Sequence, residues 1–133
     1  MLRFHKRSRD KSGKCNALAT GNSDDVVVGV LFVIDPSERS KIDEAEGLNK
    51  GYLDTTVTVL DAHDRRRKAL TYLATPDFVD DSLKPYTWYK DFVVSGSKEH
   101  GLPADYVAEF VDAIEAVADP DEIRDRRERA ILG

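Results

Sequence analysis

The fold is indicated first by the stretch Ile42-Asp43-Glu44-Ala45-Glu46-Gly47. A helix leading into it begins at Asp35-Pro36-Ser37-Glu38, where the aspartate can cap the first turn and the proline suits the first helical position. Gly47 is a natural stop, because glycine readily adopts the left-handed conformation that ends many helices. Only two residues between these ends are apolar, so we expect a surface helix with Glu46 at its carboxyl end.

Strands are predicted on both sides of this helix from the pattern of apolar residues. Residues 26–34 form a nearly continuous apolar run, rich in β-branched residues, which is typical of a strand buried on both faces. Tyr52–Leu60 and Lys68–Ala74 each alternate between two faces, so we expect them to pair as a hairpin through a turn at residues 62–65. A short strand is expected at residues 2–5, and residues 11–25 are interpreted as a polar loop.

The second half of the chain is predicted to be helical. Aromatic residues from Tyr86 to Val93 have a helix-compatible spacing that ends near Gly96, and an apolar stripe predicts a helix from Pro103 to Val117. A third helix is expected to begin at residues 119–122, with the basic run at 124–129 mostly in solvent. The length suits one core and is too short for two, so residues 1–133 are predicted to form a single domain.

Several classes of protein are excluded by composition. The single cysteine, Cys15, allows no internal disulfide, and no apolar run approaches the roughly 20 residues needed to span a bilayer. The basic start of the chain is not followed by the apolar segment of a signal peptide. We therefore expect a cytoplasmic location and no membrane partner.

The charge distribution argues against a nucleic-acid partner. The net charge is −5, although residues 1–14 carry six basic side chains and one acidic side chain, and are therefore +5, which leaves −10 elsewhere. That acidic remainder would repel phosphate, so no nucleic-acid partner is expected. The three histidines lack metal-ligand spacing, so we predict no metal, and nothing in the sequence indicates another cofactor.

Glu46 is the first candidate for chemistry. The carbonyl end of a helix carries partial negative charge, which is expected to raise the pKa of a carboxyl group placed there, and an apolar pocket would raise it further. A carboxyl group that titrates near neutrality can both accept and donate a proton. On spacing alone, however, the favoured interpretation is that Glu46 is one of many exposed acidic residues.

Five stretches of the chain resemble the gamma-glutamylcyclotransferase family. Gly29-Val30-Leu31-Phe32, the Ile42–Gly47 stretch and Gly51-Tyr52 match the region in which an Asp-Glu-x-Glu-Gly turn carries the family's catalytic glutamate, and Glu46 occupies the matching position. Further along, residues 69–73 resemble its tyrosine-bearing strand. Residues 96–106, which contain Gly-Leu-Pro, resemble a downstream segment of that family. The resemblance spans residues 26–117.

This resemblance implies an α+β fold, a small mixed β-barrel flanked by helices. It also implies an enzyme that releases 5-oxoproline when the α-amine of a small-molecule gamma-glutamyl substrate attacks its own γ-carbonyl, without a cofactor. Glu46 would be the catalytic acid and base, and Tyr52, Tyr72 and Tyr89 would bind and orient the substrate. Tyr72 and Tyr89 also have an ordinary alternative role as core aromatics.

The sequence departs from the family at its start, where a Tyr-Gly-Ser-Asn type loop that holds the substrate is absent. A misassigned start, a shortened chain and a loss of activity all fit this departure. If the chain is complete, its barrel lacks the first strand, and the unpaired edge predicts a homodimer. The alternative function is that of a catalytically inactive family member, a small-molecule binding or protein-interaction domain. The sequence does not specify the leaving amine.

Overall fold

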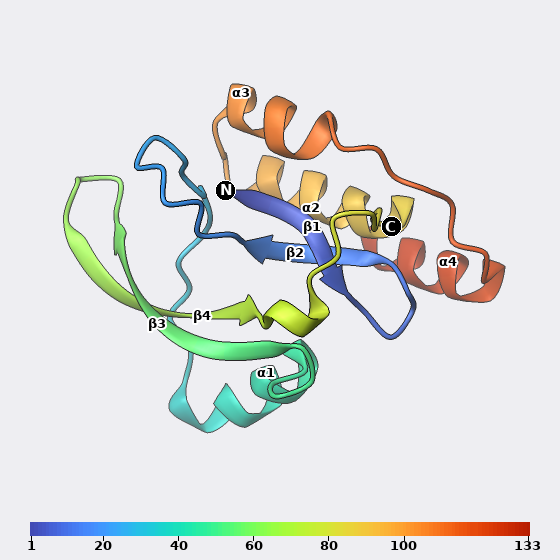
Figure 1. Ribbon diagram of the computed structural model, residues 1–133, viewed down its shortest axis with the longest axis horizontal. Coiled ribbons are helices and arrows are strands. Elements are labelled where there is room, and N and C mark those ends of the chain that lie inside the picture. Colours follow the sequence, from blue (N-terminus) through green and yellow to red (C-terminus); the bar gives the residue numbers. More distant parts are fainter. The chain divides into compact units, whose positions relative to one another are not determined.

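The computed structural model describes residues 1–133 and contains four strands and four α-helices (Figure 1). The elements are β1 (Leu2–Arg7), β2 (Gly13–Ala17), α1 (Arg39–Glu46), β3 (Tyr52–Leu60), β4 (Arg66–Ala74), α2 (Thr87–Glu99), α3 (Ala104–Val107) and α4 (Glu122–Arg129). Single 3-10 turns lie at Pro36–Glu38, Pro76–Phe78 and Ala130–Leu132, and a π-helical stretch at Ala108–Asp112 follows α3. None of the helices is both long enough and apolar enough to cross a membrane.

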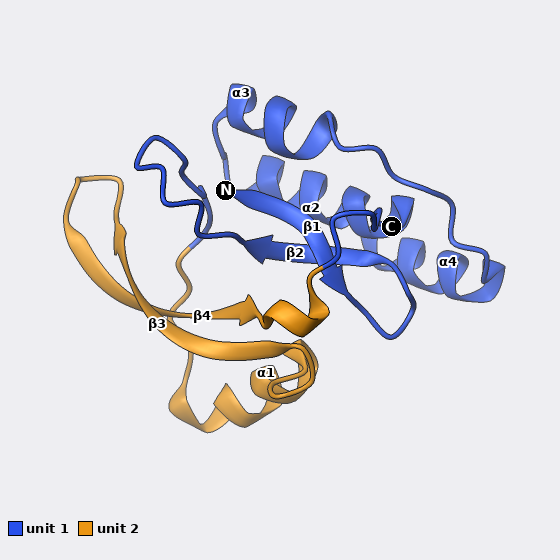
Figure 2. Cartoon of the chain, in the orientation of Figure 1, with its two compact units in different colours: residues 1–30, 80–133 blue, residues 31–79 orange.

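The chain divides into two compact units, one of residues 1–30 and 80–133 and one of residues 31–79 (Figure 2). Each unit contains one two-stranded antiparallel sheet, β1–β2 in the first and β3–β4 in the second. The α+β class is therefore confirmed, but the hydrogen-bonded strands form two hairpins and no closed barrel. The single domain remains a prediction from the sequence.

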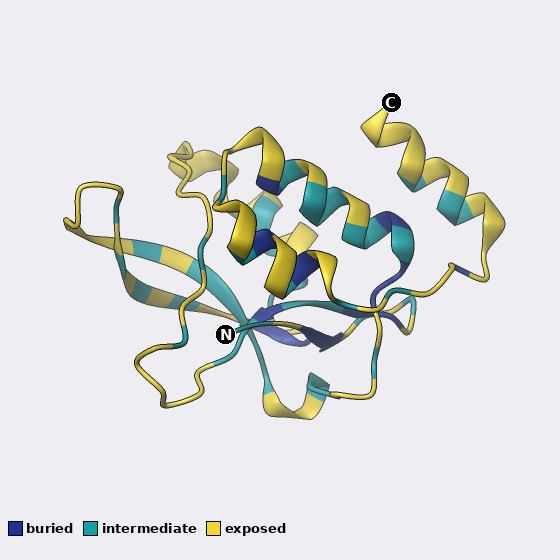
Figure 3. Cartoon of the chain, turned by 90° about the horizontal axis from the view of Figure 1, so that it is seen from above, coloured by how far each residue is buried: buried dark blue, intermediate teal, exposed yellow.

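The first unit has its core between β1 and the helices after residue 100. Phe4, Val107 and Val111 are at most 5% exposed and pack together. Partly buried side chains surround them, namely Leu2, Cys15, Tyr89, Val93, Val94, Leu102 and Ile114. Buried positions alternate with exposed ones along the helices (Figure 3), as expected for amphipathic helices on the surface of a core.

The segment interpreted as a polar loop contains a strand, β2, so that interpretation was wrong. The strand pairs antiparallel with β1, with Phe4 opposite Cys15 and a bulge between Phe4 and Lys6. At Gly13 an added Cβ would lie 2.1 Å from the Phe4 carbonyl oxygen, so the close approach of the two backbones requires glycine there. In the sequence such a glycine looks like a loop residue, which is why the strand was not predicted.

The opposite error concerns residues 26–34, which were expected to form a buried strand. They have no regular secondary structure and no ladder partner, and most of their large side chains are exposed, Val33 fully and Phe32 by 66%. β-branched residues favour an extended backbone, but a strand also needs hydrogen bonds to a neighbouring strand. Residues 26–34 have the composition of a strand and lack a strand to pair with.

The helices of the second half are confirmed with shifted ends. α2 continues through Gly96 to Glu99, whereas the helical stretch that begins at Ala104 ends at Asp112 and does not reach Val117. The third helix is capped by Asp121, whose carboxylate accepts hydrogen bonds from the amides of Ile123 and Arg124. The expected start at residue 119 was therefore two residues early.

The second unit consists of α1 and the β3–β4 hairpin, which lie side by side in Figure 1. Asp35 caps the turn before α1 by accepting a hydrogen bond from the Ser37 amide, and Gly47 ends α1 with φ at 71°. The ladder joins β3 and β4 from Tyr52 opposite Ala74 to Leu60 opposite Arg66, without a bulge. Both the surface helix and the hairpin are confirmed.

Candidate functional site

Glu46 is the last residue of α1, and its side chain is exposed. The backbone reverses immediately after it, because the Gly47 amide donates to the carbonyl of Glu44 at 3.1 Å and the Leu48 amide donates to that of Asp43 at 2.9 Å. These bonds satisfy carbonyl groups that the end of a helix leaves without partners. Glu46 is therefore held at a well-defined helix end, beside the start of β3.

Tyr72 lies on β4 and connects the hairpin to α1. Its hydroxyl donates a hydrogen bond to the carboxylate of Asp43, one turn before Glu46 on the same helix. A second connection lies next to it, because Asp54, which is opposite Tyr72 in the ladder, accepts a 2.6 Å hydrogen bond from Arg39. Arg39 Nε is also 3.7 Å from the Asp43 carboxylate, so the four side chains form one polar cluster.

The charges of this cluster act on the Tyr72 hydroxyl. The hydrogen bond to Asp43, followed by burial and the charge of Asp43, raises the pKa of Tyr72 to about 12, and the negative charge of Glu46 acts in the same direction. Glu46 is therefore within electrostatic reach of the Tyr72 hydroxyl. The phenol remains protonated over the whole neutral pH range.

Tyr52 is the first residue of β3 and is 8% exposed. It lies opposite Ala74, two residues from Tyr72 along the partner strand, so Tyr52 and Tyr72 are diagonal neighbours on one face of the hairpin. Its carbonyl oxygen accepts a 2.8 Å hydrogen bond from the Asn49 amide. Three of the four residues expected in the site, Glu46, Tyr52 and Tyr72, thus belong to one compact unit.

Tyr89, the fourth expected residue, belongs to the other unit, where it contributes to the core. Its hydroxyl accepts a 3.1 Å hydrogen bond from the Cys15 amide. Its ring meets those of Phe4 and Trp88 edge-on, with centroids 6.2 Å and 6.0 Å away. These contacts are those of a packed aromatic residue with a satisfied hydroxyl, and its contact with substrate remains a prediction.

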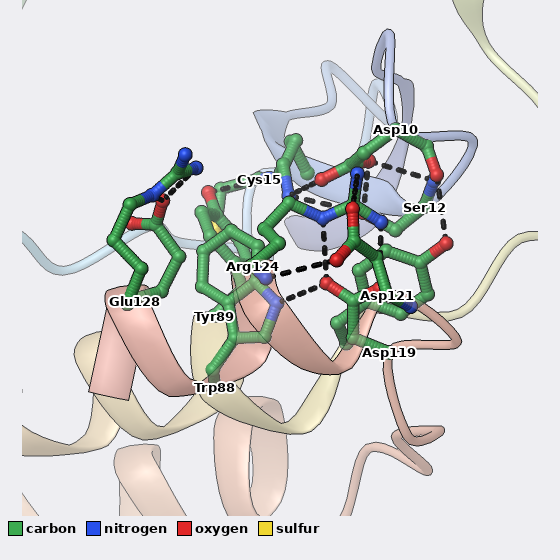
Figure 4. A network of polar contacts seen from close by, with 12 residues as sticks. Asp10, Ser12, Cys15, Trp88, Tyr89, Asp119, Asp121, Arg124 and Glu128 are labelled. Carbon is green, nitrogen blue, oxygen red and sulfur yellow. Dashed lines mark hydrogen bonds and ion pairs between the residues drawn. The ribbon is translucent and has the colours of Figure 1, made fainter. Parts of the chain in front are cut away.

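A second polar network, unrecognised in the sequence, lies in the first unit around Asp119 and Arg124 (Figure 4). The Asp119 side chain is fully buried and also accepts a 2.9 Å hydrogen bond from the Trp88 indole. Nearby, Lys14 pairs with Asp10 at 2.9 Å, and its ammonium group is 4.4 Å from the centroid of the Trp88 ring. The acidic and basic side chains of the network pair with one another. Because Arg124 lies on α4, Lys14 on β2 and Trp88 on α2, these contacts connect the three elements.

Sequence reasoning gave no role to Asp43, Arg39 or Asp54, although two signals pointed to them. Asp43 and Glu46 are three residues apart on a helix, which places them on neighbouring positions of one face. A hairpin paired symmetrically about residues 61–65 places Asp54 opposite Tyr72, as observed, although no register was predicted from the sequence. No group of three or more His, Cys, Asp or Glu side chains has an arrangement that could hold a metal ion.

Residues 26–110 match the model of the AIG2-like family. The chain belongs to this family. The matched region includes Glu46 and all three tyrosines of the expected site.

Similar proteins include curated gamma-glutamylcyclotransferases. The enzyme of Homo sapiens is 34% identical over 92 residues, which cover 68% of this chain and 47% of that protein. The enzyme of Mus musculus is 32% identical over 108 residues, which cover 80% of this chain and 55% of that protein. The resemblance inferred from the sequence motifs is thus confirmed. The chain spans about half the length of the curated relatives it matches.

Solved structures show the same fold. A protein of Homo sapiens described as uncharacterized has a TM-score of 0.76 and 27% identity, with 94% of this chain and 76% of that chain covered. A structure described as gamma-glutamyl cyclotransferase has a TM-score of 0.58 and 28% identity, with 70% of this chain and 56% of that chain covered.

Proposed function

We propose that this protein is a gamma-glutamylcyclotransferase-type enzyme that releases 5-oxoproline from a small gamma-glutamyl amine or amino acid. The observation that carries the proposal is the position of Glu46, at the end of α1 and within electrostatic reach of the Tyr72 hydroxyl. The family match and the curated relatives support the same reaction class.

The reaction needs one group that can take and return a proton. The Glu46 carboxylate removes a proton from the substrate's α-ammonium group, and the resulting amine attacks the γ-carbonyl carbon to form the ring C–N bond. Protonated Glu46 then gives its proton to the amide nitrogen, and the bond between that nitrogen and the γ-carbon breaks. The ring nitrogen loses its remaining extra proton, which converts the released amine to its ammonium form.

Each proposed residue has a separate task in this sequence. Glu46 carries the proton, and such general acid–base catalysis contributes on the order of 10²–10⁴-fold. Tyr52 and Tyr72, on one face of the hairpin, would orient the glutamyl group, and a contact of Tyr89 with substrate is a prediction of the family resemblance alone. Because the attacking and attacked groups belong to one substrate molecule, holding it folded contributes much of the remaining acceleration.

The exposure of Glu46 adds a requirement to this mechanism. Water hydrogen-bonds to an exposed carboxylate and competes with the substrate for its oxygen atoms. We therefore propose that the bound substrate displaces water from Glu46 before the amide nitrogen is protonated. The charge of Glu46 is then stabilised by the substrate ammonium group until the first proton transfer.

The deciding experiment is 5-oxoproline release from a panel of gamma-glutamyl dipeptides and amides. Glu46→Gln should lower turnover by at least about 100-fold, because the amide cannot take the ammonium proton. Glu44→Gln is the matched control, since it makes the same chemical change at an exposed position two residues earlier on α1. Equal turnover by wild type and Glu46→Gln would refute the proposed role of Glu46.

A second candidate is a binding domain that keeps the family fold without the reaction. The solvent exposure of Glu46 favours it, since an acid–base group of this kind usually works in a drier environment. A folded wild-type protein that binds a gamma-glutamyl amide in calorimetry but releases no 5-oxoproline would support this candidate. A cytoplasmic location and a homodimer remain predictions from the sequence.

A further inference from the structure

Asp43 is the residue that contacts the Tyr72 hydroxyl, and its position is fixed from several sides. Its side chain is 22% exposed, and the Tyr72 hydroxyl donates to its Oδ1 atom. Its backbone carbonyl accepts the Leu48 amide at 2.9 Å where the chain leaves α1. The end of the helix therefore fixes the backbone of Asp43, and the hydrogen bond from Tyr72 holds its carboxylate against β4.

The direction of this hydrogen bond determines what Tyr72 can offer to another molecule. An ionised carboxylate has no proton to donate, and a phenol has only one. Because that proton is directed at Asp43, the Tyr72 oxygen has only its lone pairs available. The hydrogen bond to Asp43, burial and the charge of Asp43 raise the pKa of Tyr72 to about 12 against the opposing charge of Arg39, so the phenol does not act as a base near neutrality.

We propose that Asp43 is a positioning residue that holds the Tyr72 hydroxyl proton, so that the Tyr72 oxygen accepts a hydrogen bond from the α-ammonium group of the substrate. This inference rests on the proposed function, because it assigns a role within that reaction. The ammonium group carries three N–H donors. One proton goes to Glu46, and a second N–H donates to Tyr72, which orients the nitrogen for attack on the γ-carbonyl.

A purely structural role for Asp43 is the competing explanation. The Asp43–Tyr72 hydrogen bond connects α1 to the hairpin, and so does the 2.6 Å pair of Arg39 with Asp54. The two connections are neighbours, because Asp54 lies opposite Tyr72 in the ladder. Asp54→Asn is therefore the matched control, since it weakens a connection between the same two elements but leaves the Tyr72 hydroxyl on Asp43.

The first test measures the titration of the Tyr72 hydroxyl and does not depend on enzyme activity. The protein is labelled with 13Cζ-tyrosine, its NMR signals are followed from pH 8 to pH 11, and Tyr72 is assigned by its absence in Tyr72→Phe. Asp43→Asn keeps an acceptor oxygen but removes the charge, so the pKa of Tyr72 should fall towards the ordinary value of about 10. Asp54→Asn should leave it raised. An unchanged Tyr72 titration in Asp43→Asn would overturn the proposal.

The second test separates the two roles by kinetics. Tyr72→Phe and Asp43→Ala should each lower kcat/KM by about 10- to 100-fold, the range for one hydrogen bond to a charged group. The double variant should be no slower than Tyr72→Phe, because Asp43 acts only through Tyr72. Asp54→Asn should remain within about threefold of wild type. Fully additive losses would show that Asp43 acts independently of Tyr72 and would overturn the proposal.

The third test identifies the substrate group by comparing two ligands. A gamma-glutamyl amide has the α-ammonium group, and the corresponding glutaryl amide lacks it. Tyr72→Phe should weaken calorimetric binding of the first by about tenfold or more and leave the second unchanged. Equal weakening of both ligands would overturn the assignment to the ammonium group.

The tests also separate this inference from the proposed function. A wild-type protein that releases no 5-oxoproline would refute the proposed reaction. If the Tyr72 titration still responded to Asp43→Asn, the positioning of Tyr72 by Asp43 would stand without that reaction. Release of 5-oxoproline with an unresponsive Tyr72 titration would uphold the proposed function and overturn the inference.

Discussion

The carboxylate of Asp119 accepts two hydrogen bonds from the guanidinium group of Arg124, each 2.6 Å long. The Asp119 side chain has no exposed surface, whereas that of Arg124 is 25% exposed. A paired geometry of this kind is the strongest that an arginine and a carboxylate form. The pair joins the start of α4 to the segment before it and, through the Trp88 indole, to α2.

We expect Asp119→Asn to lower the free energy of unfolding by about 2–3 kcal/mol, because it removes the charge of a fully buried carboxylate that accepts two hydrogen bonds from Arg124. Urea unfolding monitored by Trp88 fluorescence measures this change. Asp125→Asn, which removes the more exposed pair with Arg129 on the same helix, should cost less than about 1 kcal/mol. Similar losses in both variants would contradict the special role of Asp119.

The same pair predicts a loss of stability in acid. Hydrogen bonds from Arg124 hold the pKa of Asp119 well below its ordinary value of 3.8. Because the folded pKa is lowered, the stabilisation is present above pH 3.8 and declines as the pH falls below that value. Urea unfolding at pH 6, 4 and 2.5 should show a decline that is smaller in Asp119→Asn. Parallel pH dependence in the two proteins would contradict this prediction.

Gly47→Ala should destabilise the protein by about 1–2 kcal/mol, because the residue has φ at 71° and a Cβ is unfavourable in the left-handed region. The expected cause is conformational rather than steric, since the nearest atom to an added Cβ would be 3.9 Å away. Urea unfolding measures the cost. In addition, 5-oxoproline release should fall if this glycine positions Glu46. A stability equal to wild type would show that α1 can end differently.

Gly96→Ala should have the opposite effect and stabilise the protein by about 0.5–1 kcal/mol. Gly96 lies inside α2, and an added Cβ would meet no atom within 4 Å. Alanine reduces the conformational entropy of the unfolded chain and prefers the helix. The midpoint of thermal unfolding should therefore rise, and a lower midpoint would indicate a packing role for this glycine.

The sequence predicted best those elements whose determinants are local. The start of α1 at Asp35 and Pro36, its stop at Gly47 and the alternating strands of the hairpin each depend on a few adjacent residues, and all are present. The position of Glu46 at the end of the helix followed directly from these signals.

Elements that depend on distant partners were predicted poorly. β2 was missed because its pairing with β1 requires a glycine, and residues 26–34 were assigned to a strand although no neighbouring strand pairs with them. Asp119 resembled a helix cap, but its partner Trp88 is 31 residues away in the sequence. The role of Asp43 likewise depends on Tyr72, 29 residues further along.

The five-residue turn between β3 and β4 has a consequence for the order of folding. Within it, the Asp61 carboxylate accepts hydrogen bonds from the amides of His63 and Arg65. The ladder can therefore grow outward from a small loop, whose closure loses little chain entropy and takes about microseconds. The link between Trp88 and Asp119 requires a much longer loop to close. We therefore expect the hairpin that carries Tyr72 to form early, before the core of the other unit is complete.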